Sequence, residues 1–180
     1  MELKEINSLV ELFFKKHQEM FSKRMKAQEE TFLVSLKNKD LPDTNSGPFT
    51  YSWENIFIKT KILSNYLGKI ISKGERCILL SENRPEWLIS DLAIMNAGGV
   101  TVPLFTTYSE NDYEYIINNC EPKVCIVSNS SQFEKIKNHV KGNTIVISID
   151  EFNEKIEFFE NIFLKAKSDA KDFTGSKKIY

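Results

Sequence analysis

Two periods of hydrophobic and polar residues alternate along positions 76–148 of the chain. Between short apolar runs, hydrophobic residues recur every three or four positions, as on one face of a helix. The runs themselves have strand length and are typical of parallel strands buried on both faces; they read RCILLS, GVTVPLF, KVCIVS and NTIVIS. This strict alternation predicts an α/β fold, a parallel doubly wound sheet with flanking helices.

Capping residues predict where the helices begin and end. The expected helix starts are marked by Ser52, by Asn83 with Glu86, and by Ser109 with Asp112. The two pairs have the spacing of a capping box, in which each side chain bonds the backbone N–H of the other residue. We expect Gly74 to cap the end of the first helix, and Gly98 with Gly99 to end the second.

The two ends of the chain are less regular. An amphipathic helix is expected over residues 6–25 and a short strand over 31–36, followed by a loop over 37–48. The sequence thus predicts three regions, which are an N-terminal helix, strand and loop (1–48), an α/β core (49–149), and a helical or irregular tail (150–180).

Composition and charge narrow the functional classes. The 180 residues carry a formal net charge of -1, so we expect no basic surface and no nucleic-acid partner. Three cysteines without a CxxC spacing and only two histidines predict reduced thiols and no metal site. No apolar run approaches the roughly 20 residues of a membrane span. A cytoplasmic protein without a transmembrane segment is therefore expected.

Common phosphate-binding and hydrolytic motifs do not occur in the sequence. The seven glycines form neither GxGxxG nor GxxxxGK[ST], and there is no GxSxG nucleophile turn. The segment SENRPEW stands where a dinucleotide-binding fold places the glycines that let a pyrophosphate approach the backbone. These observations argue against a dinucleotide-binding fold of the usual kind and against a hydrolase with such a serine.

Six segments occur in order along residues 9–149, namely TYSW, KGER, NRPEW, the Gly-Gly turn, VPLFTT and KVCIVS. In this order and spacing they resemble the N-terminal region of the AMP-forming acyl-CoA synthetases of the adenylate-forming superfamily, in particular the long-chain fatty-acid–CoA ligase branch. The sequence departs from the family at KGER, where Gly-Asp-Arg is common. The resemblance implies that residues 49–149 are the core of the AMP-binding N-terminal subdomain.

The resemblance implies a parent enzyme that uses ATP, Mg²⁺ and CoA. In this family a carboxylate attacks the α-phosphate of ATP to form an acyl-adenylate, and the thiol of CoA then displaces AMP. The family's phosphate loop, roughly YTSGTTGxPKG, and its principal catalytic residues have no counterpart in this sequence. We therefore expect an incomplete subdomain that is truncated before that loop. This subdomain is expected to be inactive alone and to bind none of these cofactors tightly.

The expected partners of the parent enzyme are a fatty acid substrate and the remaining part of the ligase. Peripheral association of the parent enzyme with a membrane is left open. Two other interpretations also stay open at this point. One is a non-catalytic α/β interaction or ligand-binding module that keeps only the scaffold, and the other is a small flavodoxin-like binding domain unrelated to the ligases.

The candidate cofactor-binding residues are Phe105, Thr106 and Thr107, which follow a predicted strand. The resemblance implies that this loop lies near the CoA nucleotide, with threonine where some relatives carry glycine. The alternative is a hydroxyl-rich turn that leads into the helix cap at Ser109. No catalytic residue and no metal ligand is expected in the chain.

Five further residues are expected to be structural. Asn83 is expected to cap a helix and Arg84 to pair with a carboxylate, rather than to face a ligand. Gln132 and Lys135 lie where some relatives carry basic residues for the CoA phosphates, but a solvated helix face explains them better. Trp87 is expected in the core or in a contact between subdomains.

Overall fold

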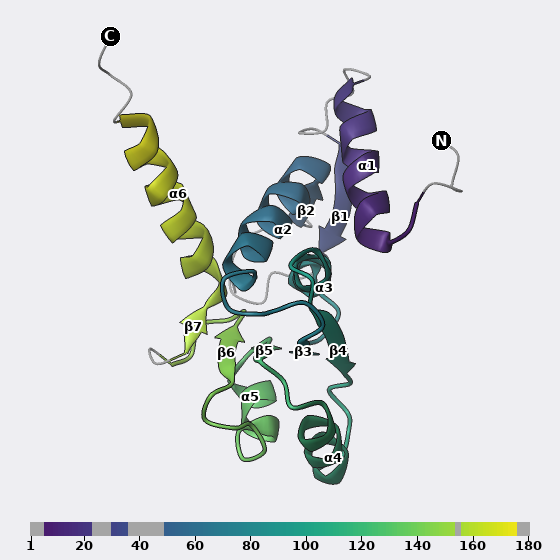
Figure 1. The fold of residues 1–180 in the computed structure, drawn as a ribbon, viewed down its shortest axis with the longest axis vertical. Coiled ribbons are helices and arrows are strands. Elements are labelled where there is room, and N and C mark those ends of the chain that lie inside the picture. The colour runs from purple at the N-terminus through teal and green to yellow at the C-terminus, as the bar shows by residue number, and fades with distance from the viewer. Residues whose placement is uncertain (1–5, 23–29, 36–48, 154–155, 176–180) are drawn as a thin grey trace.

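The computed structural model describes most of the chain. Its described residues are 6–22, 30–35, 49–153 and 156–175. Figure 1 shows the helices and strands of these ranges. The loop expected over 37–48 lies outside the described residues, as do the last positions of the helix expected over 6–25.

A five-stranded parallel sheet lies at the centre of the molecule (Figure 1). Its strands are β3 (Arg76–Leu80), β4 (Val100–Leu104), β5 (Val124–Val127), β6 (Ile145–Ser148) and β7 (Glu157–Phe158). They lie in the order β4–β3–β5–β6–β7, and each neighbouring pair is parallel. The predicted α/β fold with a parallel sheet and flanking helices is confirmed.

Helices lie on both faces of this sheet. They are α1 (Leu9–Ser22), α2 (Trp53–Leu67), α3 (Pro85–Asn96), α4 (Glu110–Cys120), α5 (Ser130–Ile136) and α6 (Phe159–Gly175). In Figure 1, α4 and α5 lie below the sheet and the other four helices lie above it. A sheet between two helical layers is shielded from water on both faces, which is the arrangement that all-parallel sheets require.

Strand β3 separates two hydrophobic cores. Cys77 and Leu79 point into a core shared with α1, α2, α3 and α6, whereas Ile78 and Leu80 point into a core shared with α4 and α5. Successive side chains of a strand point to opposite faces, and here both sets are fully buried. This is why the strand reads as a continuous apolar run in the sequence.

The path of the chain reverses across the sheet between β3 and β5. After β3 the chain passes through α3 to β4 on one side, and after β4 it crosses through α4 to β5 on the other side. In open α/β sheets, ligands bind at the carboxyl ends of two strands whose connections diverge in this way. We call the carboxyl ends of β3 and β5 the switch point.

A second, two-stranded sheet precedes the parallel one. Strands β1 (Thr31–Ser35) and β2 (Phe49–Ser52) pair in antiparallel fashion. The rings of Phe32 and Trp53 pack together beside this pair, with centroids 4.0 Å apart. Strand β2 was not predicted, because four residues that run directly into a helix carry no recognisable alternation.

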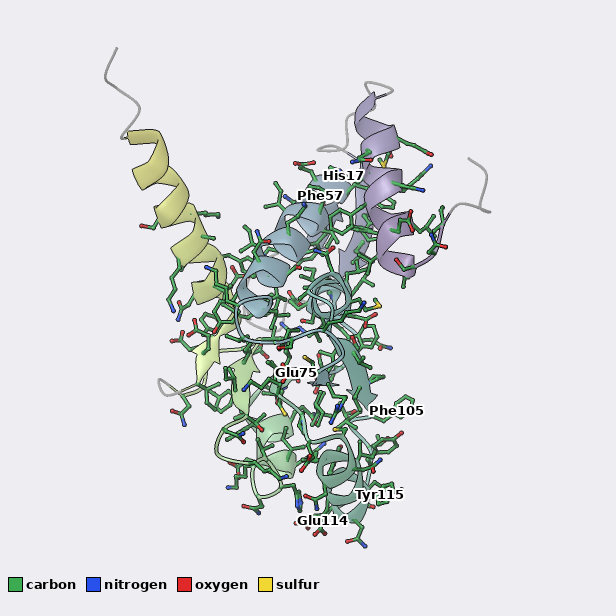
Figure 2. All side chains as sticks on the ribbon, in the orientation of Figure 1. His17, Phe57, Glu75, Phe105, Glu114 and Tyr115 are labelled. Carbon is green, nitrogen blue, oxygen red and sulfur yellow. The ribbon has the colours of Figure 1, made fainter. Side chains whose placement is uncertain are left out.

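Helix α1 is attached to α2 by ring contacts and by a polar contact of His17. The ring of His17 stacks on Phe57 with centroids 3.6 Å apart (Figure 2), and its Nε2 lies 2.8 Å from Glu54 Oε2. Phe13 stacks on Trp53 with centroids 5.8 Å apart. The amphipathic helix expected over residues 6–25 is confirmed over Leu9–Ser22, whereas the described residues 6–8 before it are not helical.

The predicted N-terminal caps of α2 and α4 are present, whereas α2 ends earlier than predicted. Ser52 begins α2 as predicted, and the capping box of Ser109 with Asp112 is present at the start of α4. The predicted end of α2 is wrong, because Gly68 caps the helix instead of Gly74. Gly74 lies in the turn before β3 with φ of 84°, a left-handed conformation that glycine adopts without strain.

The tail adds one strand and one helix to the molecule. The two-residue strand β7, which the sequence analysis did not predict, pairs with β6 and extends the sheet. Helix α6 then buries Phe159 and Phe163 in the hydrophobic core that it shares with α1, α2 and α3. Lys59 of α2 contacts α6 twice, because its Nζ donates to Glu160 Oε1 at 2.7 Å and lies 4.4 Å from the ring centroid of Phe163.

The position of β3 between the two cores generates a stability prediction. Leu79 is 0% exposed, whereas Leu164 of α6 is 60% exposed. We expect Leu79→Ala to lower the free energy of unfolding by about 2–5 kcal/mol, because it removes buried contacts and leaves a cavity. Leu164→Ala, the matched control, should lower it by less than about 0.5 kcal/mol. Urea unfolding followed by circular dichroism measures both, and equal losses would contradict a core centred on β3.

Candidate functional site

Polar side chains gather at the switch point. Ser81 and Glu82 follow β3, and Ser128 and Asn129 follow β5. Asn129 Oδ1 accepts a hydrogen bond from the backbone N–H of Gln132 and thereby caps α5. The parallel register of β3 and β5 brings these strand ends side by side. We call these five residues the switch-point cluster.

Glu82 is the charged member of the switch-point cluster. Gln132 Nε2 donates a hydrogen bond to Glu82 Oε1 at 2.8 Å. Burial by itself raises the pKa of Glu82, but hydrogen bonds to the carboxylate from Ser128, Gln132 and Asn129 outweigh burial and hold the pKa below its ordinary value. Glu82 is therefore ionised at neutral pH, and neutral donors stabilise its charge.

Gln132 is not on a solvated helix face, and this part of the sequence prediction is wrong. Its side chain is 5% exposed, and its Oε1 is buried without a hydrogen-bond partner in the structure. A buried unpaired acceptor costs about 1–3 kcal/mol, so the bond to Glu82 has to hold the side chain in place. This bond could not be predicted from the sequence, because the two residues are 50 positions apart.

A second polar network lies at the start of α3. Arg84 Nε lies 2.8 Å from Glu86 Oε2, and Arg84 Nη1 lies 2.9 Å from Asp150 Oδ1, just after β6. Tyr51 OH donates to Glu86 Oε1 at 3.2 Å. Burial and the neighbouring Glu86 charge raise the pKa of Tyr51 to about 12. The predicted pairing of Arg84 with a carboxylate is confirmed, and the network joins β2, α3 and the end of β6.

The predicted helix cap at Asn83 is wrong. Helix α3 begins at Pro85, and Arg84 occupies the cap position without a side-chain hydrogen bond to the helix. Asn83 is exposed, and Glu86, its expected partner, belongs to the network just described. Trp87 is partly buried against the hydrophobic core shared by α1, α2, α3 and α6, which confirms its predicted place in the core.

Phe105, Thr106 and Thr107 form the turn between β4 and α4. Phe105 is 68% exposed, and its ring points away from the body of the molecule (Figure 2). The Phe105 carbonyl accepts a hydrogen bond from Tyr113 OH at 2.8 Å, and the Thr106 carbonyl accepts one from Lys135 Nζ at 2.6 Å. The structure thus shows an anchored turn with a projecting ring, and its binding of CoA stays a prediction.

Helix α5 contacts both the switch-point residue Glu82 and the turn over 105–107. Gln132 and Lys135 are three positions apart on this helix; Gln132 bonds Glu82 after β3, and Lys135 bonds Thr106 after β4. Lys135, expected on a solvated face, is partly buried. One short helix therefore connects the ends of two neighbouring strands. We define the candidate site as the switch-point cluster together with the turn over 105–107.

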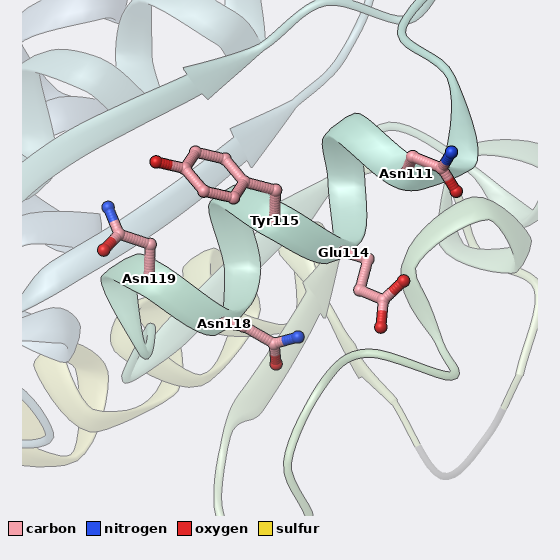
Figure 3. A pocket seen from close by; sticks show the side chains of 5 residues that line it. All are labelled: Asn111, Glu114, Tyr115, Asn118 and Asn119. Carbon is pink, nitrogen blue, oxygen red and sulfur yellow. The ribbon is translucent and has the colours of Figure 1, made fainter.

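A separate hollow lies on the surface of α4. It is lined by Asn111, Glu114, Tyr115, Asn118 and Asn119 (Figure 3). All five residues come from one face of one helix, and among the described residues no other element lines the hollow. Nothing converges there from a second strand end, so we do not include the hollow in the candidate site.

Metal and thiol chemistry find little support in the part of the chain that the structure describes. There, no group of three or more His, Cys, Asp or Glu side chains is placed to hold a metal ion. Burial raises the pKa of the Cys77 thiol to about 12 and also raises the pKa of Cys125. Neither thiol is ionised at neutral pH.

Of the helices described, none is long and apolar enough to cross a membrane.

The chain is similar in sequence to a known enzyme family and to several of its characterised members. Residues 26–174 match the family model described as AMP-binding enzyme. The chain is 32% identical over 137 residues to fatty acyl-CoA synthetase A of Dictyostelium discoideum, covering 72% of this chain and 20% of that protein. It is 30% identical over 90 residues to the long-chain-fatty-acid–CoA ligase ACSBG1 of Rattus norvegicus, covering 47% of this chain and 12% of that protein.

Solved structures share the fold over most of this chain. The anthranilate CoA ligase AuaEII in complex with anthranoyl-AMP superposes with a TM-score of 0.68 at 20% identity, over 92% of this chain and 30% of that one. The luciferase-like enzyme of the mealworm Zophobas morio superposes with a TM-score of 0.66 at 15% identity, over 90% of this chain and 35% of that one. At these identities the likeness shows the fold alone.

The lowered pKa of Glu82 generates a prediction on acid stability. Because the pKa is lower in the folded chain than in the unfolded one, the carboxylate stabilises the fold above the ordinary glutamate pKa of about 4.3. That stabilisation is lost as the pH falls through the lower folded value. We expect Glu82→Gln to lower the free energy of unfolding by about 1 kcal/mol at neutral pH, since bonds to a charged acceptor become bonds to a neutral one.

Urea unfolding at a series of pH values measures this effect. The difference between wild type and Glu82→Gln should shrink as the pH is lowered through the folded-state pKa of Glu82, because the wild-type carboxylate then also becomes neutral. Glu114→Gln, on the exposed face of α4, is the control and should behave like wild type throughout. A difference that stays constant over the whole range would argue against an ionised, hydrogen-bonded Glu82.

Proposed function

The chain belongs to the AMP-binding enzyme family, and we propose that it is the N-terminal α/β part of a fatty-acyl-CoA synthetase. The proposed reaction of the whole enzyme is the ATP-dependent activation of a long-chain fatty acid, through an acyl-adenylate, to an acyl-CoA thioester. The observation that carries this proposal is the family match over residues 26–174, together with relatives named for fatty acyl and long-chain fatty acid substrates.

The chain spans only a small part of the length of the relatives that it matches. It spans 20% of the Dictyostelium protein and 12% of the rat protein. The acyl substrate, the remaining part of the ligase as a partner, and a cytoplasmic or membrane-peripheral location therefore belong to the proposal for the whole enzyme. The proposal takes the fatty acid from the names of the relatives.

The residues of this chain fit a supporting role. Stabilising the leaving phosphates of ATP takes a cradle of backbone N–H groups and hydroxyls with a lysine and Mg²⁺. The sequence has no glycine-rich loop of that kind, and the described residues include no cluster of three or more His, Cys, Asp or Glu side chains that could hold a metal ion. We infer that other parts of the enzyme hold ATP and Mg²⁺, and that this chain by itself is inactive.

CoA is the cofactor that the turn over 105–107 fits best. The exposed ring of Phe105 offers a flat apolar surface on which a nucleotide base can stack. Thr106 and Thr107 add hydroxyl groups beside it, but their Cβ atoms keep a ligand farther from the backbone than glycine would. The proposed contacts with CoA are therefore made by side chains, and they are weak in this chain alone.

An assay of pyrophosphate release tests the proposed function. The purified chain, incubated with ATP, Mg²⁺, palmitate and CoA, should release no pyrophosphate above the rate without fatty acid. The whole enzyme that contains this chain should show release that depends on the fatty acid, together with loss of the free CoA thiol. Adenylate formation by the chain alone would contradict the supporting role. A whole enzyme without fatty-acid-dependent release would favour the non-catalytic module.

A further inference from the structure

Two consecutive carbonyl groups of the turn over 105–107 are held by side chains from two different helices. Tyr113 of α4 bonds the Phe105 carbonyl at 2.8 Å, and Lys135 of α5 bonds the Thr106 carbonyl at 2.6 Å. Tyr113 is 2% exposed, so its hydroxyl is directed by a buried ring. Connecting segments run over the protein surface and are more mobile than the elements that they connect. Here the anchors come from the structure on either side.

Lys135 stands out among the lysines of the described residues. Other lysines pair with carboxylates, among them Lys59, Lys137, Lys141 and Lys165. Lys135 bonds a backbone carbonyl instead, while its side chain is partly buried. A hydrogen bond from a charged donor is stronger than one between neutral groups. A long cationic side chain is thereby committed to fixing one peptide group.

The anchors also fix what surrounds the turn. The backbone N–H of Tyr108 donates to the Phe105 carbonyl at 3.3 Å, and the rings of Phe105 and Tyr108 meet edge to face with centroids 5.3 Å apart. The capping box of Ser109 and Asp112 follows directly. The exposed ring of Phe105 therefore stands on a backbone that is ordered before any ligand arrives, and such pre-organisation lowers the entropy cost of binding.

Helix α5, which carries Lys135, is itself tied to the switch point. Asn129 caps the helix, and Gln132 bonds the ionised Glu82. Since α5 has only seven residues, these two contacts set the position of Lys135 as well. A continuous series of bonds thus runs from Glu82 at the end of β3, through α5, to the turn at the end of β4.

We propose that Lys135 is a positioning residue for the turn over 105–107, acting together with Tyr113 to hold Phe105 in a binding-ready place. The proposal deepens the proposed function, on which it rests for the identity of the ligand as CoA. Lys135 itself need not touch the ligand. Its contribution is to the order of the turn, which can be measured with no ligand present.

Amide hydrogen exchange of the ¹⁵N-labelled chain tests the order of the turn. In Lys135→Met, which keeps the side-chain length without the ammonium group, the Tyr108 amide should exchange about tenfold faster than in wild type. Lys135→Arg should restore slow exchange, since a guanidinium also donates to a carbonyl. Tyr113→Phe, which keeps the buried ring, should accelerate the same amide independently.

Two controls separate this effect from a general loss of stability. Lys137→Met, which removes a lysine paired with Glu134 on the same face of the sheet, should leave the Tyr108 amide unchanged. In every variant the amides of β3 and β5 should exchange as in wild type, because they report unfolding of the core. If the Tyr108 amide exchanges at the wild-type rate in Lys135→Met, the positioning role of Lys135 is overturned, whatever the rate in Tyr113→Phe.

Titration with CoA at millimolar concentration then links the turn to its ligand. In wild type, the amide resonances of residues 105–108 should shift, and Lys135→Met should weaken this binding about tenfold while Lys135→Arg restores it. Equal CoA affinity for wild type and Lys135→Met would overturn the positioning role for binding. Wild type without any shift in the turn would overturn CoA as the ligand, and the exchange rates would still decide the positioning role.

Discussion

Burial of β3 on both faces is the constraint on which the rest of the structure depends. Its alternate side chains supply the centre of both hydrophobic cores, so the helices above and below the sheet pack against the same strand. Its two neighbours, β4 and β5, lie on opposite sides of it, and both run parallel to it. The switch point exists because β3 lies between β4 and β5, and Glu82 is placed there as the second residue after β3 ends.

The charges at this edge of the sheet are satisfied within the chain. Glu82 is surrounded by neutral donors, and Arg84 is shared between Glu86 and Asp150. Groups that are already paired are poor candidates for proton transfer or for phosphate binding, which both need free capacity. The arrangement suits a rigid part of an enzyme that supports a substrate site without reacting itself. This electrostatic character agrees with the supporting role proposed for the chain.

The alternation of strands and helices could be predicted because burial on two faces is recorded locally, as short apolar runs such as that of β5. Strands β2 and β7 escaped prediction because each is defined by its pairing with another strand, and their few residues carry no pattern of their own. The failed cap at Asn83 has a related cause. Glu86 had the right spacing, but Arg84 binds it from the neighbouring position. Likewise, the bond of Gln132 to Glu82 depends on tertiary structure that no local window contains.

The proline in the edge strand β4 has a consequence for self-association. The backbone N–H of Val100 donates towards β3, to the Glu75 carbonyl, and the alternation of a strand then turns Pro103 to the open side. Proline has no N–H to offer there, so a strand from a second molecule would meet a gap in the middle of its hydrogen-bond ladder. This flank of the sheet is thereby protected against the strand-to-strand stacking that leads to insoluble fibres.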